Sequence, residues 1–168
     1  MSSAGKSNAR TAAAGTFELT TYFEGRTRAW GIFEDRFGRV RRRFSVVMDG
    51  RWQGDTFVID EEFVYDSGES EYRSWKVTPQ GEGQFRARAA DCIGEAIGRS
   101  DAEHIHMTYK LRLQMTGRTL VVDFDDRIHR MGEGRAVNRA TMSKWGIKLG
   151  ELSLFFVRDT DLHSENVS

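Results

Sequence analysis

Apolar and polar residues alternate along most of this chain, and the clearest example covers residues 104–115. Its apolar positions are Ile105, Met107, Tyr109, Leu111, Leu113 and Met115, with polar residues between them. Because successive side chains of a strand point to opposite faces, a period of two predicts a half-buried β-strand. A turn at residues 116–118 follows, and Leu120, Val122, Phe124 and Ile128 form the apolar face of the next stretch. The two stretches together predict one β-hairpin.

The same alternation, interrupted by short turns that contain glycine, predicts about nine strands in all. They cover residues 27–35, 39–48, 55–65, 71–77, 84–92, 104–115, 120–129, 135–144 and 147–158. The stretch 135–144 could instead hold a helical turn. No amphipathic helix is convincing anywhere in the chain.

Several of these strands reach ten or more residues, whereas strands are most often about 5–6 residues long. Long strands joined by tight turns in one domain favour an all-β fold, a single up-and-down antiparallel barrel of the lipocalin or calycin kind with about 8–10 strands, because closure removes exposed edges. A two-sheet sandwich is the alternative. Residues 17–25 predict a short helical turn, which could plug one barrel end with Phe17, Leu19, Tyr22 and Phe23.

The length of 168 residues is enough for one domain with a substantial core. We expect a disordered lead over residues 1–15, a barrel over 16–158 and a frayed tail over 159–168. Lys and Arg number 25, as do Asp and Glu, so the formal net charge is zero and nucleic-acid binding is not expected. No apolar stretch approaches the roughly 18 residues of a membrane helix, so stable membrane insertion is not expected either.

The single cysteine, Cys92, cannot form a disulfide within the chain, which favours the cytoplasm. The lead contains basic residues but lacks the apolar segment of a signal peptide. Ala89, Ala90 and Ile93 surround Cys92 and predict a buried, unreactive thiol, with a nucleophile as the alternative.

No catalytic, phosphate-binding or paired-cysteine metal motif is present, so no cofactor is expected. His104 and His106 share one strand face and could bind a metal if a third ligand arrived. Lys110 and Arg112 continue the same face, however, which favours a solvated outer surface.

Two charged residues interrupt otherwise apolar faces. Asp126 shares a face with Val122, Phe124 and Ile128, while Arg42 lies on the face of Phe44. Because an unpaired buried charge is costly, we expect Arg42 to point into the barrel and to pair with Asp126 or with Asp60. Such a pair could mark the ligand-binding end or be a structural ion pair. If the lumen is polar instead, the acidic face with Asp123 and Asp125 would line it.

Several short motifs in a fixed order resemble a bacterial family called domain of unknown function 3833. The motifs lie at residues 23–25, 29–38, 42–44, 60–66 with Gly68, 73–75, 90–98, 124–126, 138–146 and 150–151. The resemblance covers nearly everything from Phe17 to Arg158 and implies a lipocalin-type barrel, without an assigned activity. Many members carry a lipoprotein-type leader; this chain shows neither a hydrophobic leader nor an early cysteine, so membrane anchoring is not expected.

Three functions are compatible with such a barrel. The first is binding of an apolar or amphipathic molecule such as a fatty acyl chain, whose carboxylate would meet Arg42, Arg73 or Arg139. The walls would come from Trp30, Phe33, Phe44, Phe57, Trp75, Tyr109, Phe124 and Phe155. The second is a lipid isomerase, cyclase or hydratase that uses an inward carboxylate, with Asp126 and Asp60 as candidates and Tyr65 as a donor. The third is a scaffold with a filled core. The oligomeric state is left open.

Overall fold

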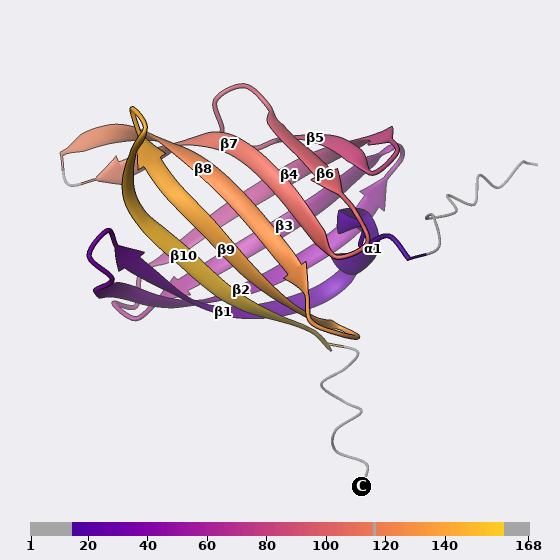
Figure 1. The fold of residues 1–168 in the computed structure, drawn as a ribbon, viewed down its shortest axis with the longest axis horizontal. Coiled ribbons are helices and arrows are strands. Elements are labelled where there is room, and N and C mark those ends of the chain that lie inside the picture. The colour runs from indigo at the N-terminus through magenta and orange to yellow at the C-terminus, as the bar shows by residue number, and fades with distance from the viewer. Residues whose placement is uncertain (1–14, 116, 160–168) are drawn as a thin grey trace, which may run out of the picture.

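Ten antiparallel strands close into one barrel in the computed structural model, which describes residues 15–115 and 117–159. The elements are α1 (Leu19–Tyr22), β1 (Gly25–Asp35), β2 (Val40–Gln53), β3 (Thr56–Tyr65), β4 (Ser70–Gly81), β5 (Gln84–Arg88), β6 (Ala96–Ser100), β7 (His104–Met115), β8 (Arg118–Arg130), β9 (Arg135–Lys144) and β10 (Ile147–Arg158). Each strand pairs with its neighbours in sequence, and β1 pairs with β10 from Thr27↔Arg158 to Asp35↔Gly150 (Figure 1). The predicted up-and-down barrel is confirmed.

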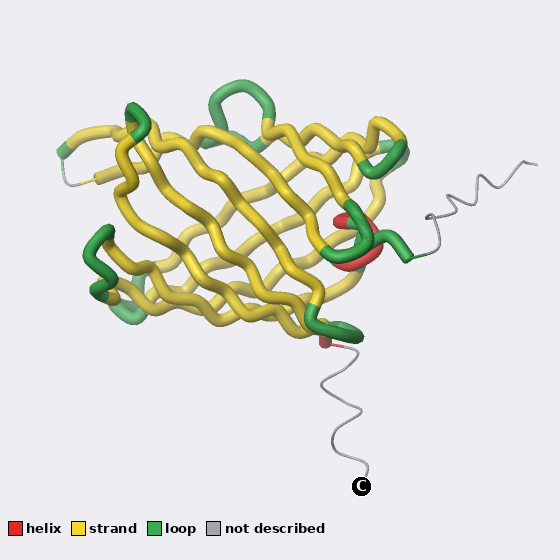
Figure 2. The backbone as a smooth tube through the Cα atoms, viewed as in Figure 1, coloured by secondary structure: helices red, strands yellow, loops and turns green. Residues whose placement is uncertain are grey.

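The largest departure from the expected strand list lies at residues 84–100. Residues 84–92 do not form one strand: β5 ends at Arg88, residues 89–95 form a loop, and β6 follows as a strand that alternation did not identify. Residues 135–144 are entirely strand, so the alternative of a helical turn is wrong. Apart from α1, the rest of the described backbone is strand, turns and short loops (Figure 2).

The up-and-down order places the turns in two groups. The turns after β1, β3, β7 and β9 lie at one end of the barrel, and those after β2, β4, β6 and β8 lie at the other, beside α1 (Figure 1). We call the first the open end and the second the closed end.

The closed end is plugged by α1 and the residues around it. Phe17, Leu19, Tyr22 and Phe23 are all buried, as the sequence predicted, and the ring of Phe23 meets that of Phe156 edge-on with centroids 5.5 Å apart. The plug fits because β2 has a glycine, Gly50, at the point where the backbone of Phe23 crosses this strand. A Cβ at Gly50 would lie 1.8 Å from the Phe23 carbonyl oxygen.

The loop at residues 89–95 packs on β7. Ile93 donates its backbone N–H to Lys110 over 2.9 Å, Arg112 donates to Asp91 over 2.8 Å, and Cys92 forms an isolated bridge with Leu111. Cys92 is buried, and burial, the leading cause, raises the pKa of its thiol. The expected buried cysteine is therefore present.

The expected lead and most of the expected tail, residues 1–14 and 160–168, lie outside the described residues. Among those described, no helix has the length and apolar character needed to cross a membrane.

Candidate functional site

The barrel encloses a cavity of about 830 Å³. Its walls are mostly apolar side chains that alternate inward along the strands, and Leu19 and Phe23 form its floor at the closed end. The aliphatic and methionine part of the lining comprises Val46, Met48, Ile59, Val77, Met107, Leu111, Leu113, Leu120, Val122, Ile128, Met142, Leu149, Leu152 and Leu154. The lumen is thus a chamber and not a filled core.

One polar group on the lumen wall is centred on Asp126 of β8. Tyr109 of β7 donates its hydroxyl to Asp126 Oδ2 over 3.0 Å, and Asn138 of β9 donates its side-chain amide to Asp126 Oδ1. The pairing of the strands places these residues side by side, since Asp126 faces Met107 on β7 and Ala140 on β9. Both partners of Asp126 are neutral, so its carboxylate is hydrogen-bonded without an opposite charge.

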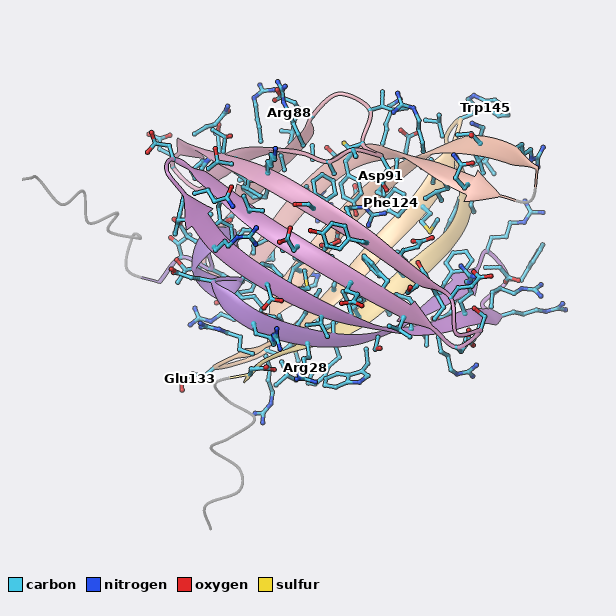
Figure 3. All side chains as sticks on the ribbon, turned by 180° about the vertical axis from the view of Figure 1, so that it is seen from behind. Arg28, Arg88, Asp91, Phe124, Glu133 and Trp145 are labelled. Atoms are coloured by element: carbon cyan, nitrogen blue, oxygen red, sulfur yellow. The ribbon has the colours of Figure 1, made fainter. Side chains whose placement is uncertain are left out.

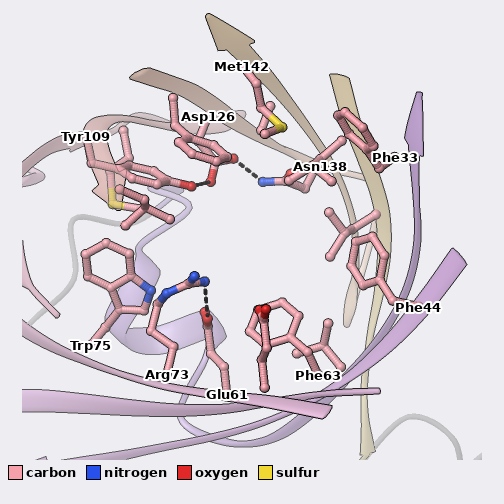
Figure 4. A pocket seen from close by; sticks show the side chains of 18 of the residues that line it. Phe33, Phe44, Glu61, Phe63, Arg73, Trp75, Tyr109, Asp126, Asn138 and Met142 are labelled. Atoms are coloured by element: carbon pink, nitrogen blue, oxygen red, sulfur yellow. Dashed lines mark hydrogen bonds and ion pairs between the residues drawn. The ribbon is translucent and has the colours of Figure 1, made fainter. Parts of the chain in front are cut away.

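A second polar group, on the opposite wall in Figure 4, joins Arg73 and Glu61. Arg73 of β4 holds Asp91 of the 89–95 loop with bonds of 2.8–3.1 Å from Nε and Nη2, and its Nη1 lies 3.6 Å from Glu61 Oε2. The Arg73 side chain is 16% exposed and that of Glu61 is 12% exposed. The guanidinium therefore binds Asp91 through one donor edge and forms a longer ion pair with Glu61 through Nη1.

Enclosure in the lumen shifts the proton affinity of both inward carboxylates. Burial raises the pKa of Glu61 to about 7, against the opposing charge of Arg73, and the negative charge of Asp126 adds to the increase. Burial likewise raises the pKa of Asp126 to about 6, although the bonds from Asn138 and Tyr109 act in the opposite direction. Burial and then Asp126 raise the pKa of Tyr109 well above its ordinary value. Tyr109 therefore remains a protonated donor at neutral pH.

Aromatic rings border the two polar groups. Tyr109 stacks on Phe124 with centroids 5.0 Å apart and meets Trp75 edge-on at 5.3 Å. The guanidinium of Arg73 lies over Phe63, 5.4 Å from its centroid. In Figure 4 the open space lies between these rings, Glu61 and Asp126.

Arg42 lies toward the open end of the cavity, beyond the inner groups. Its guanidinium stacks over Tyr65 at 4.3 Å and binds Glu69 Oε2 at 3.1 Å, while Tyr65 donates to Glu71 over 2.9 Å. The expected pairing of Arg42 with Asp60 or Asp126 is therefore wrong. The alternation of the sequence correctly predicted that Arg42 faces the lumen, but it did not predict how deep in the barrel Arg42 lies. Near the mouth, Arg42 contacts Glu69 of the β3–β4 turn.

Three further residues expected at the site lie on the outer wall. Asp60 binds Arg51 at 2.6 Å and Ser74 at 2.7 Å outside the barrel, and these bonds, against a burial effect of opposite sign, lower its pKa. Arg139 pairs with Glu151 at 2.9 Å and is largely exposed. Trp30 is 49% exposed, because its strand turns Ala29 and Gly31 inward. Contrary to the expectation, none of these three residues lines the lumen.

Most of the remaining expected residues line the lumen, and two lie in the core or on the outer wall. Those that line the cavity are Phe33, Phe44, Tyr65, Arg73, Trp75, Tyr109, Phe124 and Asp126, together with Arg42 at the mouth. Phe57 is fully buried in the core but is not part of the cavity lining, and Phe155 projects outward next to Trp30. Figure 3 shows the same division, with Phe124 inside the barrel and Arg28, Arg88 and Trp145 projecting from it.

The two neighbouring histidines lie on the outer face. His106 contacts Asp125 at 3.0 Å and His104 contacts Asp101 at 2.9 Å. Within residues 15–115 and 117–159, no three metal-binding side chains come together. The alternative of a metal site at His104 and His106 has no third ligand there.

Reasoning from the sequence missed Glu61, Asp91 and Asn138 as members of the site. A signal for Glu61 was available, since it shares the period-two face of Phe57, Ile59, Phe63 and Tyr65. Asn138 similarly lies between the inward Ala136 and Ala140. Alternation gives no such signal for Asp91, although it belongs to the motif at residues 90–98, because it lies in a loop whose packing on β7 is a tertiary feature.

Comparisons with known proteins agree with this architecture. The family model described as "Protein of unknown function (DUF3833)" matches residues 2–158. Among solved structures, the S-type phycobiliprotein lyase CpeS from Guillardia theta superposes with a TM-score of 0.60 at 9% sequence identity, over 83% of this chain and 90% of that one. No match was found among curated protein sequences. At this identity the likeness to the lyase concerns the fold alone.

Proposed function

The chain belongs to the DUF3833 family, and from this premise we propose that its barrel binds a small apolar or amphipathic, lipid-like molecule in the lumen. The cavity carries the proposal: its volume of about 830 Å³ lies within the roughly 300–1,000 Å³ typical of small-molecule sites. A mostly apolar lining with a few convergent polar groups is also typical of such sites. The scaffold alternative expects a filled core, and the cavity counts against it.

The direct test identifies what the purified protein carries. Native mass spectrometry should show a bound species beyond the mass of the chain, and solvent extraction followed by mass spectrometry should identify a molecule with a substantial apolar body. Release of no small molecule, together with no uptake of an added hydrophobic fluorophore, would overturn the proposal.

A pair of matched variants locates the binding in the lumen. Ala140 on β9 lines the cavity, whereas its neighbour Thr141 points to the outer wall. Ala140→Phe should occupy lumen volume and weaken uptake of the fluorophore by about tenfold or more, which is the loss expected for roughly 1.4 kcal/mol. Thr141→Phe adds the same ring outside and should leave binding unchanged. Equal effects from both variants would place the binding outside the lumen.

Acid–base catalysis on the bound molecule is a second candidate, favoured by one observation. Asp126 has a pKa raised to about 6 by burial and touches the hydroxyl of Tyr109, a combination suited to moving a proton near neutral pH. Asp60 and Tyr65 do not support this role, because Asp60 lies outside and Tyr65 is bound to Glu71 at the mouth. Conversion of the extracted molecule by the protein, lost in Asp126→Asn while binding persists, would establish it.

A further inference from the structure

The charges of the inner lumen are unbalanced toward the negative. Glu61, Asp91 and Asp126 bring three carboxylates to the region, and Arg73 brings the one guanidinium that contacts any of them among the described residues. Asp91 holds Arg73 through both Nε and Nη2, which leaves Glu61 a single longer contact of 3.6 Å. Among the described residues, the hydrogen-bond partners of Asp126 are the neutral side chains of Tyr109 and Asn138. The negative charge that Arg73 does not balance therefore lies on Glu61 and Asp126, the two carboxylates that face the lumen.

We propose that the lumen selects an amphipathic molecule with a basic nitrogen, which is held between the carboxylates of Glu61 and Asp126. The inference rests on the proposed binding function and names the class of ligand. A protonated nitrogen supplies Asp126 with the opposite charge that its neutral partners do not provide, and supplies Glu61 with a closer cation than Arg73, which Asp91 also holds. Such charge-assisted hydrogen bonds are stronger than neutral ones. A carboxylate ligand would instead face two like charges, with the guanidinium of Arg73 already engaged.

The aromatic border of the two polar groups supports the same ligand. Trp75, Tyr109 and Phe124 form a contiguous aromatic wall beside Asp126, and Phe63 already carries the guanidinium of Arg73 on its face. Aromatic faces attract cations as well as apolar groups. Rings and carboxylates together form a site for a cation with an apolar body (Figure 4).

Other charged groups near the two carboxylates do not remove the imbalance. Behind Asp126, on the outer face, Asp125 pairs with His106 at 3.0 Å. At the mouth, Arg42 is bound to Glu69, and Tyr65 is bound to Glu71. The mouth thus adds two further acids and one guanidinium to the cavity lining.

The ligand class sets the direction of the pH dependence. With pKa values raised to about 7 and about 6, Glu61 and Asp126 are partly protonated in the empty lumen near neutral pH. A bound cation favours their ionised forms, so it displaces protons and binds more tightly as the pH rises from about 5 to about 8, where an alkylamine is still protonated. A carboxylate ligand would require proton uptake and would show the opposite trend.

The experiment compares dodecylamine, dodecanol and dodecanoate on the full chain, freed of co-purified molecules, by displacement of the hydrophobic fluorophore below their aggregation concentrations. At about pH 8 the amine should bind about tenfold or more tighter than the dodecanoate. In free energy this preference equals a shift of about one pKa unit. In Glu61→Gln/Asp126→Asn this preference should largely disappear. The matched control, Asp60→Asn/Asp123→Asn, removes the same charge from the outer wall, where Asp60 binds Arg51 and Asp123 binds Lys110, and should keep it.

Calorimetry of amine binding to the unmodified protein, in buffers of different ionisation enthalpy, should show net proton release. This measurement does not depend on the variants being folded. Dodecanoate binding as tightly as the amine, or proton uptake with the amine, would overturn the inference while the lumen remained a binding site. Failure of all three compounds to displace the fluorophore would also overturn the inference, whereas a protein that takes up no fluorophore and releases no small molecule would overturn the proposed function as well.

Discussion

At the scale of single residues, Glu61 and Asp126 dominate the electrostatics of the lumen. Both line the cavity, and each has a pKa raised by burial, to about 7 and about 6 respectively. The native state therefore binds protons that the unfolded chain has already lost at the same pH. Such groups lower the free energy of unfolding as the pH rises through this window.

Replacement of both carboxylates by amides should remove this pH dependence. Between about pH 4 and pH 7 the unmodified protein should lose stability relative to Glu61→Gln/Asp126→Asn, by on the order of 3 kcal/mol, because ionisation of the enclosed acids is unfavourable. All other carboxyl groups are the same in both proteins, so their contributions cancel in the difference between the two free energies of unfolding. Urea unfolding of both proteins across this pH range measures it. A difference that stays constant with pH would show that Glu61 and Asp126 titrate normally.

Arg73 and Arg42 both face the lumen but should differ in their effect on stability. Arg73→Met leaves Glu61 and Asp91 without their cation in a largely buried place and should cost about 3 kcal/mol. Arg42→Met breaks a pair whose side chains are 41% and 71% exposed and should cost less than about 1 kcal/mol. Urea unfolding at pH 7 compares them. Equal losses would mean that the two ion pairs are equally screened by water.

At the scale of secondary-structure elements, alternation predicted nearly every long strand, because each has one face toward the lumen or core and one toward solvent. The short strand β6 was not predicted, and the reason is that it contains Gly98. A glycine within a strand argues against a strand in the sequence, yet here a Cβ would lie 2.0 Å from the ring of Phe85. The glycine is needed for close packing against β5, which only the folded structure shows.

The contact between α1 and β2 can be tested at Gly50. In Gly50→Ala the new Cβ would clash with the backbone carbonyl of Phe23, which lies 1.8 Å away and cannot rotate aside as a side chain would. We expect a loss of about 1–3 kcal/mol in the free energy of unfolding, as for other overpacked sites. Urea unfolding gives the loss, and Trp52, whose ring is 5.1 Å from that of Phe57, reports the local change by fluorescence. Unchanged stability would indicate that α1 is loosely seated.

At the scale of the whole molecule, the sequence predicted a closed barrel but not the neighbours across its lumen. Strand alternation determines which face a side chain occupies, while its depth depends on register and strand tilt around the closed sheet. Arg42 was placed on the correct face and paired with the wrong residues for this reason. The placement of Glu61 and Asp126 across the lumen from each other, on strands β3 and β8, depends on closure and has no local signal in the chain.

A barrel with an apolar chamber should be more stable when the chamber is occupied. A ligand that binds the native state alone adds about 2.7 kcal/mol at a concentration of 100 times its Kd. For a chain of this size each kcal/mol raises the melting temperature by about 2–4 °C, so saturation should raise it by roughly 5–10 °C.

Removal of the co-purified molecule should lower the melting temperature, and its return should restore the loss in a concentration-dependent way. Ala140→Phe should respond far less, because its lumen is partly filled. A melting temperature that is the same with and without ligand, for a protein shown to bind it, would mean that the unfolded chain binds it equally well and that the closed lumen contributes no specificity.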